Sequence, residues 1–401
     1  MQAYSADVLI IGGGIIGLTL SLELKRRYAD ARIVLIEKER DLGLHASGRN
    51  SGVLHAGFYY TADSLKARFC RDGNQALTEY CTERRLRINR CGKLVVARSE
   101  TELPQLEELL NRGNANGVEV HAVTAGEARA IEPRVKTLER ALWSPTTASV
   151  DPVQVIAALA ADAAATGVQI WRNTAYLKRT PDGVRTTCGD VHAGYIVNAA
   201  GLYADRIARD FGFAEHFRIL PFKGLYLYSS EPPGALRTNI YPVPDLKNPF
   251  LGVHFTITVE GHIKIGPTAI PALWREHYDG FKRFSWREFT EIVGLETKLL
   301  LSSRFGFGRL ALQEMQKHLK RRLVRFAADL VEGVRLDQFQ QWGRPGLRAQ
   351  LVNVRGRKLE MDFCFEGDEK SFQVLNAVSP AFTCAIPFSR FLADEIGRRV
   401  A

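Results

Sequence analysis

The sequence lacks the features that mark membrane proteins, secreted proteins and repeat proteins. It has no apolar run as long as the roughly 18 residues that a membrane-spanning helix needs. It has no low-complexity tract and no internal period, which excludes solenoids and other repeat architectures. The first predicted strand begins at Val8, which leaves no room for a signal or transit peptide. We therefore expect a cytoplasmic protein.

Cysteine is scarce and shows no functional spacing. The chain contains no Cys-x-x-Cys pair and no arrangement of cysteine and histidine with metal-ligand spacing. We expect reduced, mostly buried thiols, no disulfide and no metal site. The six cysteines are Cys70, Cys81, Cys91, Cys188, Cys364 and Cys384.

Acidic residues are fewer than basic ones. The 401 residues include 54 lysines and arginines but only 44 aspartates and glutamates, which gives a net charge of +10. Such an excess is typical of proteins that meet nucleic acid, an anionic membrane surface or acidic substrates, and composition alone does not choose among these. With 46% hydrophobic and 24% charged residues, the chain otherwise has a globular composition and the length for two domains.

An apolar strand runs into a glycine-rich turn near the start of the chain. Residues 8–11 (Val-Leu-Ile-Ile) are typical of a buried parallel strand. Residues 12–17 then read Gly-Gly-Gly-Ile-Ile-Gly, a Gly-x-Gly-x-x-Gly pattern that opens a predicted helix. A second apolar strand, residues 33–36, ends on Glu37.

Each part of this unit suits a bound dinucleotide. The glycines permit a tight turn and let a pyrophosphate approach the backbone. The amino terminus of the helix favours the negative charge of the pyrophosphate, and Glu37 can accept hydrogen bonds from ribose hydroxyls. The predicted contacts are Gly12, Gly14, Ile15, Ile16, Gly17, Glu37 and Lys38.

The remaining pattern predicts a discontinuous α/β protein with two domains. A helix over 153–166, with Pro152 in its first turn and Gly167 at its end, resumes the strand–helix–strand rhythm of a parallel sheet. Strands over 168–171, near 175–178 and 184–187, and over 195–201 continue it. Aromatic-rich alternating strands at 224–228, 250–256 and 262–265 predict an antiparallel sheet. We predict a Rossmann-like dinucleotide-binding domain over 1–75, 150–215 and 335–401, and an inserted α+β substrate domain over 76–149 and 216–334.

Several helices have recognisable ends. Ser64 is an N-cap for a helix that continues to about Arg87, and Thr124 with Glu127 forms a capping box. A helix over 102–113 is expected to end at Gly113. Two long amphipathic helices are expected over 281–301 and 310–330, and a last helix from about Pro380.

The second amphipathic helix carries a basic face made of Lys317, Lys320, Arg321, Arg322 and Arg325. Three interpretations stay open: a solvated face, a docking surface for anionic lipid, or a nucleic-acid contact. No recognition motif accompanies the charge, so no nucleic acid is expected. Lipid docking would place the protein peripherally on the cytoplasmic face of the membrane and suit transfer of electrons to a membrane quinone.

Residues 45–60 form a segment rich in glycine, serine and histidine, just beyond the second strand. Close approach of backbone to a planar ring needs such small residues. We interpret His45 as a side chain satisfied by a local carbonyl, and His55 as a group that takes a proton from a substrate hydroxyl. The small residues 198–201 either leave room for a ligand or pack a helix closely on the sheet.

These segments together resemble the FAD-dependent D-amino-acid oxidase-like superfamily, and within it most nearly the L-2-hydroxyglutarate dehydrogenase/oxidase group. The similarity covers nearly the whole chain. Besides the Gly-x-Gly-x-x-Gly pattern with Glu37, it rests on residues 47–60 (Ser-Gly-Arg-Asn-Ser-Gly-Val-Leu-His-Ala-Gly-Phe-Tyr-Tyr), 64–68, 198–205, 221–224, 250–256, 266–267 and 348–350.

The resemblance implies an FAD enzyme that oxidises a CH–OH or CH–NH carbon by hydride transfer to flavin. His55 would lie near the flavin as proton acceptor or orienting group, and residues 376–380 would close over the ring system. The further cofactor contacts it implies are Ser47, Arg49, Asn50, Ser51, Gly52, Ala200, Gly201, Ser379 and Pro380.

A small anionic 2-hydroxy acid such as L-2-hydroxyglutarate needs cationic partners. Arg348 is the first candidate because arginine binds carboxylate through two parallel hydrogen bonds, and Lys223 and His254 follow. A structural ion pair for Arg348 and a core position for His254 are the alternatives. The chain departs from the group at Lys223, where arginine is common, at Ile257, also in place of arginine, and in the bulkier residues 381–388.

Other functions compete with this interpretation. An amine oxidase of the glycine or sarcosine oxidase type needs no base for a hydroxyl. A flavoprotein whose basic face binds RNA or a partner protein is a different class. An NAD-only dehydrogenase would need a second nucleotide-binding half directly after Glu37, where the glycine- and serine-rich segment lies. Membrane quinone and O2 are both open as electron acceptors.

Overall fold

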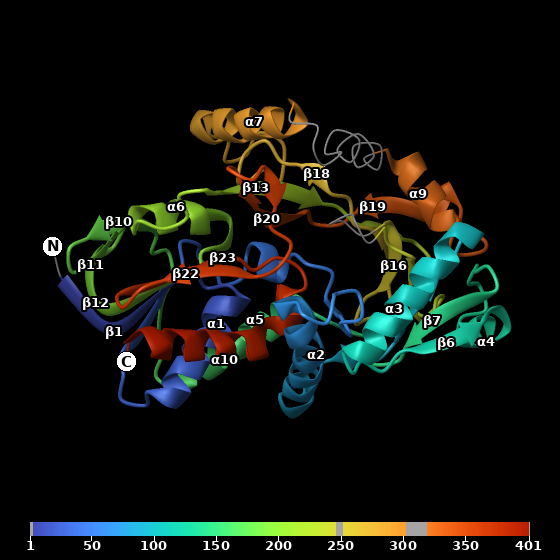
Figure 1. Ribbon diagram of the computed structural model, residues 1–401, viewed down its shortest axis with the longest axis horizontal. Helices are drawn as coiled ribbons and strands as arrows, with labels where there is room; N and C mark the ends of the chain where they lie inside the picture. The colour runs from blue at the N-terminus through green and yellow to red at the C-terminus, as the bar shows by residue number, and fades with distance from the viewer. Residues whose placement is uncertain (1–2, 246–251, 302–318, 401) are drawn as a thin grey trace. The chain divides into compact units, whose positions relative to one another are not determined.

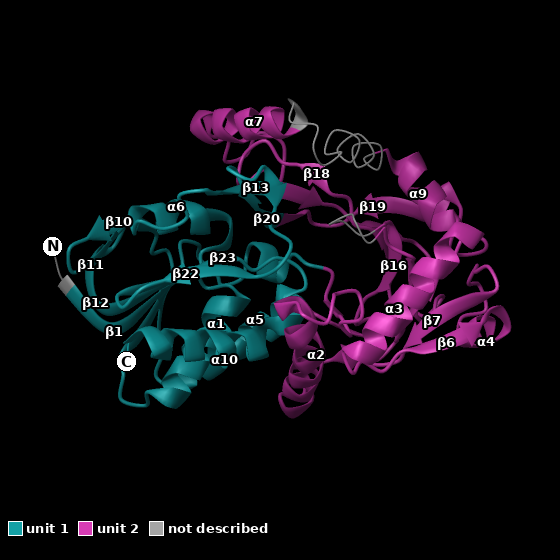
Figure 2. Ribbon diagram, in the orientation of Figure 1, with its two compact units in different colours: residues 1–50, 152–221, 348–401 teal, residues 51–151, 222–347 magenta. Residues whose placement is uncertain are grey.

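The computed structural model describes residues 3–245, 252–301 and 319–400. The chain forms two compact units (Figure 2). Unit 1 comprises residues 1–50, 152–221 and 348–401, and unit 2 comprises residues 51–151 and 222–347. Contacts thus group residues 51–75 and 335–347 with unit 2, whereas the sequence assigned them to the nucleotide-binding domain. The domain boundaries themselves stay a prediction.

A parallel sheet forms the centre of unit 1, as the sequence predicts. Four strands pair in parallel with β1 or its neighbours, and Ile11 at the end of β1 is in register with Ile36 and Asn198. The strands are β1 (Ala3–Ile11), β2 (Ile33–Ile36), β9 (Gln169–Trp171), β12 (Gly189–Asn198) and β23 (Ser371–Asn376), in the order β9–β2–β1–β12–β23. The β-branched residues at the centre of the sheet, such as Ile10, Val34 and Val197, are buried because helices cover both faces.

Three helices pack together on one face of this sheet (Figure 1). They are α1 (Ile15–Arg27), α5 (Pro152–Ala165) and α10 (Ala381–Val400), and α1 contacts both of the others. The Oγ1 of Thr19 in α1 lies 2.7 Å from Ser389 Oγ in α10. Pro152 begins α5 and Gly167, with φ +89°, follows its end, both as predicted. The helix α6 (Ala204–Asp210) lies on the opposite face.

One prediction about unit 1 was wrong in its pairing. The strands β10 (Tyr176–Thr180) and β11 (Gly183–Thr186) form an antiparallel hairpin, and β11 pairs antiparallel with β12. Of the three strands between α5 and β12, only β9 joins the sheet in parallel. The hairpin is antiparallel because its turn is too short for a crossover connection. A further strand, β22 (Cys364–Gly367), pairs antiparallel with β23.

Unit 2 contains an eight-stranded sheet with one parallel pair. Neighbouring strands are antiparallel except β5 and β15, which run parallel with Lys93 opposite Asn239. The sequence did not predict β15. In order, the strands are β19 (Phe339–Trp342), β14 (Leu227–Ser229), β17 (Ile263–Gly266), β16 (His254–Ile257), β15 (Asn239–Pro242), β5 (Lys93–Val96), β7 (Arg140–Ser144) and β6 (His121–Thr124).

The helices of unit 2 confirm the predicted caps and shift some predicted ends. Ser64 caps α2 (Leu65–Glu83) by accepting from Ala67 N, and Thr124 with Glu127 forms the capping box of α4 (Ala125–Ile131). The helix α3 (Leu103–Ala115) continues past Gly113, and α7 (Trp286–Leu301) begins later than residue 281. The helix α9 (Lys320–Ala328) covers part of the predicted 310–330, and residues 310–318 lie outside the described ranges.

Shorter strands complete the two units. The strand β8 (Ala148–Val150) pairs with β3 (Val53–Leu54) and β4 (Ile88–Asn89). The strands β13 (Phe217–Gly224) and β20 (Gly346–Asn353) cross the boundary between the units along the chain. In unit 2 β13 pairs with β18 (Ile270–Pro271), and in unit 1 β20 pairs with β21 (Lys358–Leu359). No helix among the residues described is long and apolar enough to cross a bilayer.

Gly113, the predicted end of α3, lies inside the helix and packs closely against Val120. A Cβ on Gly113 would lie 2.3 Å from Val120 Cγ1, so the glycine permits close packing inside the helix. We expect Gly113→Ala to lower the free energy of unfolding by about 1–3 kcal/mol, measured by urea denaturation. The matched control is Gly126→Ala in α4, where the nearest atom is 3.9 Å away and we expect a gain of about 0.5–1 kcal/mol. Equal stability of Gly113→Ala and the wild type would contradict this packing argument.

Candidate active site

Backbone crowding at the end of β1 requires glycine at two of the predicted positions. Gly12 has φ +116°, and a Cβ there would lie 2.5 Å from the carbonyl oxygen of Ala199. A Cβ on Gly17 would lie 2.0 Å from the carbonyl oxygen of Gly12. The strand, the turn and the first turn of α1 therefore pack backbone against backbone. This is the cradle that a pyrophosphate needs in order to approach the helix amino terminus.

Glu37 and Ser47 hold the turn in place. Glu37 is buried; its Oε2 accepts from Gly13 N at 2.9 Å and its Oε1 accepts from Glu39 N at 3.0 Å. A carboxylate oxygen has more than one acceptor direction, so Glu37 keeps capacity for ribose hydroxyls. Ser47 Oγ accepts from Ile15 N at 2.9 Å, which joins the segment after β2 to the start of α1. This arrangement fits the adenosine and pyrophosphate parts of FAD.

The other predicted cofactor contacts of unit 1 lie in ordered loops. Lys38 Nζ contacts Glu39 and lies 3.0 Å from His45 Nε2, so His45 has side-chain partners where a backbone carbonyl was expected. Three more of these residues make backbone contacts: Arg49 donates to Leu44 O at 2.7 Å, Asn50 donates to Ser47 O at 2.7 Å, and Ala200 N donates to Asn198 Oδ1 at 3.1 Å.

The remaining predicted residues of unit 1 lie at element ends. Gly201 has φ +53°, and a Cβ atom on it would lie more than 4 Å from every described residue other than its chain neighbours. Ser379 and Pro380 directly precede α10. Arg348 lies half-buried on β20. The space at Gly201 favours the reading in which the small residues after β12 leave room for a ligand.

In unit 2, His55 directly follows β3 and is half-buried. Its carbonyl accepts a hydrogen bond from Cys70 Sγ of α2 at 3.3 Å. Burial is the larger cause and the charge of Lys93 the smaller one, and together they lower the pKa of His55 to about 3. The imidazole is therefore neutral at pH 7. A neutral imidazole can accept a proton from a substrate hydroxyl.

His254 is the first residue of β16 and is 3% exposed. Its Nδ1 lies 2.8 Å from the carbonyl oxygen of Gly252, and its ring stacks on Tyr241 at 3.7 Å between centroids. A carbonyl oxygen can only accept, so Nδ1 of His254 carries a proton. The ring is thus held in the sheet by a backbone hydrogen bond and by an aromatic stack, as the core position predicts.

Two lysines of unit 2 are buried, and the sequence pattern did not predict a role for either of them. Lys93 Nζ lies 4.5 Å from the ring centroids of Phe58 and Tyr59, and burial lowers the pKa of Lys93 to about 7. Lys264 Nζ lies 4.7 Å from the Tyr226 ring and donates to Ser51 O at 3.0 Å. The available signal was a lysine inside each apolar strand run, Lys-Leu-Val-Val and Ile-Lys-Ile-Gly. Charge in a buried strand is uncommon without a function or a partner.

Ser51 and Gly52 are held firmly within unit 2. Besides the bond from Lys264, Ser51 Oγ accepts from Val53 N at 3.3 Å, and the carbonyl of Gly52 accepts from Val150 N at 2.8 Å. Gly52 has φ +77°, which favours glycine. The segment that leads to His55 is thus fixed by strands β8 and β17.

Lys223 lies elsewhere in unit 2. Its Nζ donates to Tyr278 O at 3.0 Å, and burial lowers its pKa. Burial and the charge of Lys223 together lower the pKa of His277 to about 4. Ile257, the other departure from the family pattern, is 2% exposed in the hydrophobic core, where an arginine would need a buried partner.

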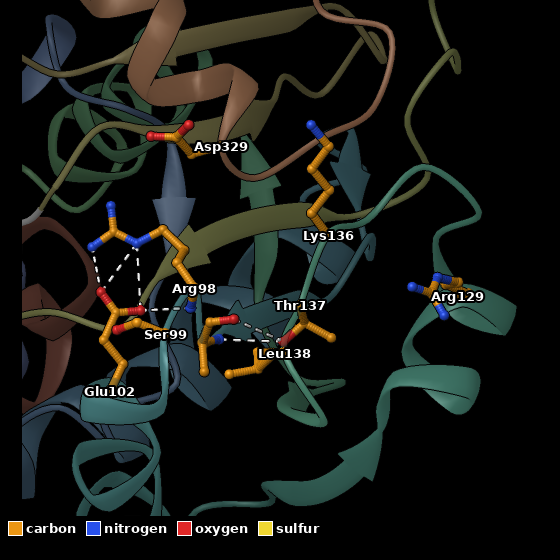
Figure 3. A pocket seen from close by; sticks show the side chains of 9 residues that line it. Arg98, Ser99, Glu102, Arg129, Lys136, Thr137, Leu138 and Asp329 are labelled. Atoms are coloured by element: carbon orange, nitrogen blue, oxygen red, sulfur yellow. Dashed lines mark hydrogen bonds and ion pairs between the residues drawn. The ribbon is translucent and has the colours of Figure 1, made fainter.

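A hollow of about 680 Å³ on unit 2 contains none of the predicted site residues. Figure 3 shows Arg98 pointing toward Glu102, and Arg98 Nε donates to its Oε1 at 3.1 Å. The lining is Ala97, Arg98, Ser99, Glu102, Arg129, Lys136, Thr137, Leu138 and Asp329. Its charges are of both signs, so we do not assign the active site to this hollow.

Comparisons with known proteins agree with the geometry of the turn. The family model described as "FAD dependent oxidoreductase" (DAO) matches residues 7–394. The chain is 37% identical over 400 residues to the L-2-hydroxyglutarate dehydrogenase of Escherichia coli O17:K52:H18, covering 97% of this chain and 93% of that protein. It is 36% identical over 420 residues to the mitochondrial L-2-hydroxyglutarate dehydrogenase of Homo sapiens, covering 98% and 89%.

Solved structures show the same fold. The L-alpha-glycerophosphate oxidase of Mycoplasma pneumoniae with FAD bound has a TM-score of 0.77 at 23% identity, covering 99% of this chain and 95% of that one. The glycine oxidase of Geobacillus kaustophilus has a TM-score of 0.72 at 21% identity, covering 99% and 95%.

The predicted α/β fold, FAD cofactor and oxidoreductase class are thereby confirmed, and the NAD-only interpretation was wrong. The family match spans both units and includes the glycine turn, Glu37 and the segment that contains His55. The chain belongs to the family of FAD-dependent oxidoreductases that is named DAO.

Proposed function

We propose that the protein oxidises L-2-hydroxyglutarate, or a similar small 2-hydroxy acid, to the corresponding 2-oxo acid. The observation that carries the proposal is the position of His55 directly after β3, where burial and the charge of Lys93 lower its pKa to about 3 and leave its imidazole neutral. Oxidation of an alcohol carbon needs an acceptor for the hydroxyl proton, and a neutral histidine is such an acceptor. The names of the full-length relatives support the substrate class.

His55 and His254 divide the handling of the proton in this proposal. Bound FAD supplies the acceptor for the hydride that leaves the substrate C2. His55 takes the hydroxyl proton as the C2–O bond gains double-bond character. His254, fixed by Gly252 O and by the stack on Tyr241, is the second side chain proposed to orient the hydroxyl. Burial keeps the ring of His55 neutral.

Arg348 and Lys223 are the proposed partners of the substrate carboxylates. Arg348 can bind one carboxylate through two parallel N–H donors. Lys223 uses one of its three donors on Tyr278 O, which leaves two for a ligand. Lysine binds carboxylate as a point charge, with less geometric selection than arginine. A lysine at this position therefore fits a small acid whose second carboxylate varies in position.

We also propose that the electrons leave to a membrane quinone while the protein lies on anionic lipid. The aromatic segment 281–287 of unit 2 supports this: Phe281 is 83% exposed and Trp286 is 72% exposed. Lys282, Arg283 and Arg287 beside them are exposed as well. Aromatic rings flanked by cations are typical of the membrane interface.

The basic face of α9 supports the same docking. Arg321, Arg322 and Arg325 are exposed, while Leu323, Val324 and Ala327 of the same helix pack in the core. The face is therefore solvated in the protein alone, and its charge is available to attract an anionic surface. Lys317 of the predicted basic face lies outside the described residues.

Replacement of His55 distinguishes the hydroxy-acid function from amine oxidation. We expect L-2-hydroxyglutarate to bleach the flavin band of the anaerobic wild-type protein, and His55→Ala to slow that reduction by about 100-fold or more because the base is lost. The matched control is His121→Ala on the exposed strand β6, which should reduce at the wild-type rate. Rapid bleaching by an amino acid together with a mild effect of His55→Ala would overturn the proposal in favour of an amine oxidase.

Vesicle binding tests the membrane proposal. We expect co-sedimentation with phosphatidylglycerol–phosphatidylcholine vesicles but not with phosphatidylcholine alone, and roughly tenfold weaker binding of Phe281→Gln with Trp286→Gln because apolar rings no longer insert. Leu177→Gln, at a residue of β10 that is 54% exposed, is the control for loss of a surface apolar group. Absence of binding, with reoxidation by O2 as fast as by a soluble quinone, would favour an oxidase free in solution.

A further inference from the structure

The eight-stranded sheet of unit 2 has one apolar and one polar face at strands β16 and β17. Phe255 and Ile257 of β16 and Ile263 and Ile265 of β17 belong to the same hydrophobic core. Side chains alternate between the two faces of a strand, so the other side chains of these strands point away from that core. They are His254, Thr256 and Lys264, and all three are buried.

Lys264 is a close neighbour of His254 on this polar face. Lys264 lies directly opposite Thr256, and Gly266, two residues further along β17, lies opposite His254. Lys264 and His254 are therefore diagonal neighbours on adjacent antiparallel strands, a spacing of about 7–8 Å. At that spacing two long side chains on one face can contact the same small ligand.

The ammonium of Lys264 has donors to spare. Its Nζ donates to Ser51 O at 3.0 Å and lies 4.7 Å from the centroid of the Tyr226 ring. An ammonium has three donors, so two remain for a ligand. Glu260 acts on Lys264 only at longer range and is itself paired with Arg87 at 2.9 Å. Lys264 therefore has a backbone oxygen and an aromatic face beside it, but no carboxylate partner among the described residues.

Two hydroxyl groups on the polar face lack a partner. They belong to Thr256, opposite Lys264, and to Tyr241, whose ring stacks on His254 at 3.7 Å between centroids. Both residues are buried, and neither hydroxyl has a hydrogen-bond partner within residues 3–245, 252–301 and 319–400. The face thus gathers buried donors whose acceptors are missing, which is costly in a folded protein.

A carboxylate supplies what this face lacks. It carries a negative charge and two oxygens that accept several hydrogen bonds. Burial lowers the pKa of Lys264 to about 8, so its ammonium is charged at pH 7 and can form a charge-assisted hydrogen bond. A water molecule could accept from these donors but would leave the buried charge without a counterion.

We propose that Lys264 binds the carboxylate on C2 of the substrate and thereby selects 2-hydroxy acids. The inference rests on the proposed function and deepens it. A 2-hydroxy acid carries its hydroxyl and this carboxylate on adjacent carbons, so the side chains that bind them must be close neighbours. His254 is proposed to orient the hydroxyl, and Lys264 is its diagonal neighbour on the same face. Lys264 thus adds a third cation to Arg348 and Lys223.

A purely structural lysine is the alternative. The bond to Ser51 O holds the segment that leads to His55, and an anchor of this kind needs one donor only. A partner for a carboxylate needs the positive charge as well. The two roles therefore differ in how binding responds when the charge is removed from the protein, from the ligand, or from both.

The test is calorimetric binding of two ligands to the oxidised, FAD-loaded enzyme: 2-oxoglutarate, and its derivative in which the carboxyl on C2 is an amide. We expect the wild type to bind the acid about 10- to 100-fold more tightly than the amide, because the charge-assisted bond is lost. Lys264→Met keeps the length of the side chain without its charge. It should bind the acid about 10- to 100-fold more weakly and distinguish the two ligands by less than about threefold.

Two further variants are the controls. Lys264→Arg keeps the charge and should keep the preference for the acid. Lys178→Met removes an exposed lysine of β10 and should bind both ligands like the wild type. Equal preference for the acid in the wild type and in Lys264→Met overturns the inference, and so does a wild type that binds neither ligand.

A crystal structure of the wild-type enzyme with 2-oxoglutarate decides the question even if Lys264→Met does not fold. We expect a carboxylate oxygen at about 2.7–3.2 Å from Lys264 Nζ. A ligand whose carboxylates are bound elsewhere, with Lys264 still bonded only to Ser51 O, rejects the inference.

Failure of this inference and failure of the proposed function are distinguishable. If L-2-hydroxyglutarate leaves the flavin oxidised but 2-oxoglutarate binds and loses affinity in Lys264→Met, the carboxylate site stands and the proposed reaction is wrong. If L-2-hydroxyglutarate bleaches the flavin but Lys264→Met keeps the preference for the acid, the function stands and the role of Lys264 is rejected.

Discussion

Close packing of backbone at the end of β1 is the constraint on which unit 1 depends. A side chain at Gly12 would meet Ala199, and a side chain at Gly17 would meet Gly12. This crowding brings α1 against the sheet and brings the end of β12 against the turn. Glu37 then ties the turn to β2 through Gly13 N. The site for the dinucleotide is therefore a consequence of how three strands and one helix meet, and not of any single contact with the cofactor.

The hydrophobic sheet of unit 2 contains buried cationic and histidine side chains. Lys93 and Lys264 lie over tyrosine rings, and His254 stacks on Tyr241. Apolar residues in these positions would give a more stable core, since each buried cation carries a desolvation cost. Polar groups retained at such a cost are characteristic of functional sites. The low pKa values of His55 and Lys93 share this origin, because both side chains have lost their water.

The departures from the family pattern differ in their structural meaning. Lys223 keeps a cation at its position and has donors to spare beyond Tyr278 O. Ile257 belongs to the hydrophobic core, so its position now contributes packing and not charge. The proposed substrate therefore remains a small acid, with the cationic contribution resting on Arg348 and Lys223 together with Lys264.

Local features could be read from the sequence because they depend on residues a few positions apart. The Gly-x-Gly-x-x-Gly turn, the Ser64 cap and the capping box at Thr124 are of this kind. So is the presence of His55 in a glycine-rich segment. The tertiary structure alone decided the parallel pairing of β5 with β15, the burial of Lys93 among rings from two distant segments, and the desolvation of His55. Desolvation and the field of a neighbouring charge are set by residues far apart in the chain, which no local pattern encodes.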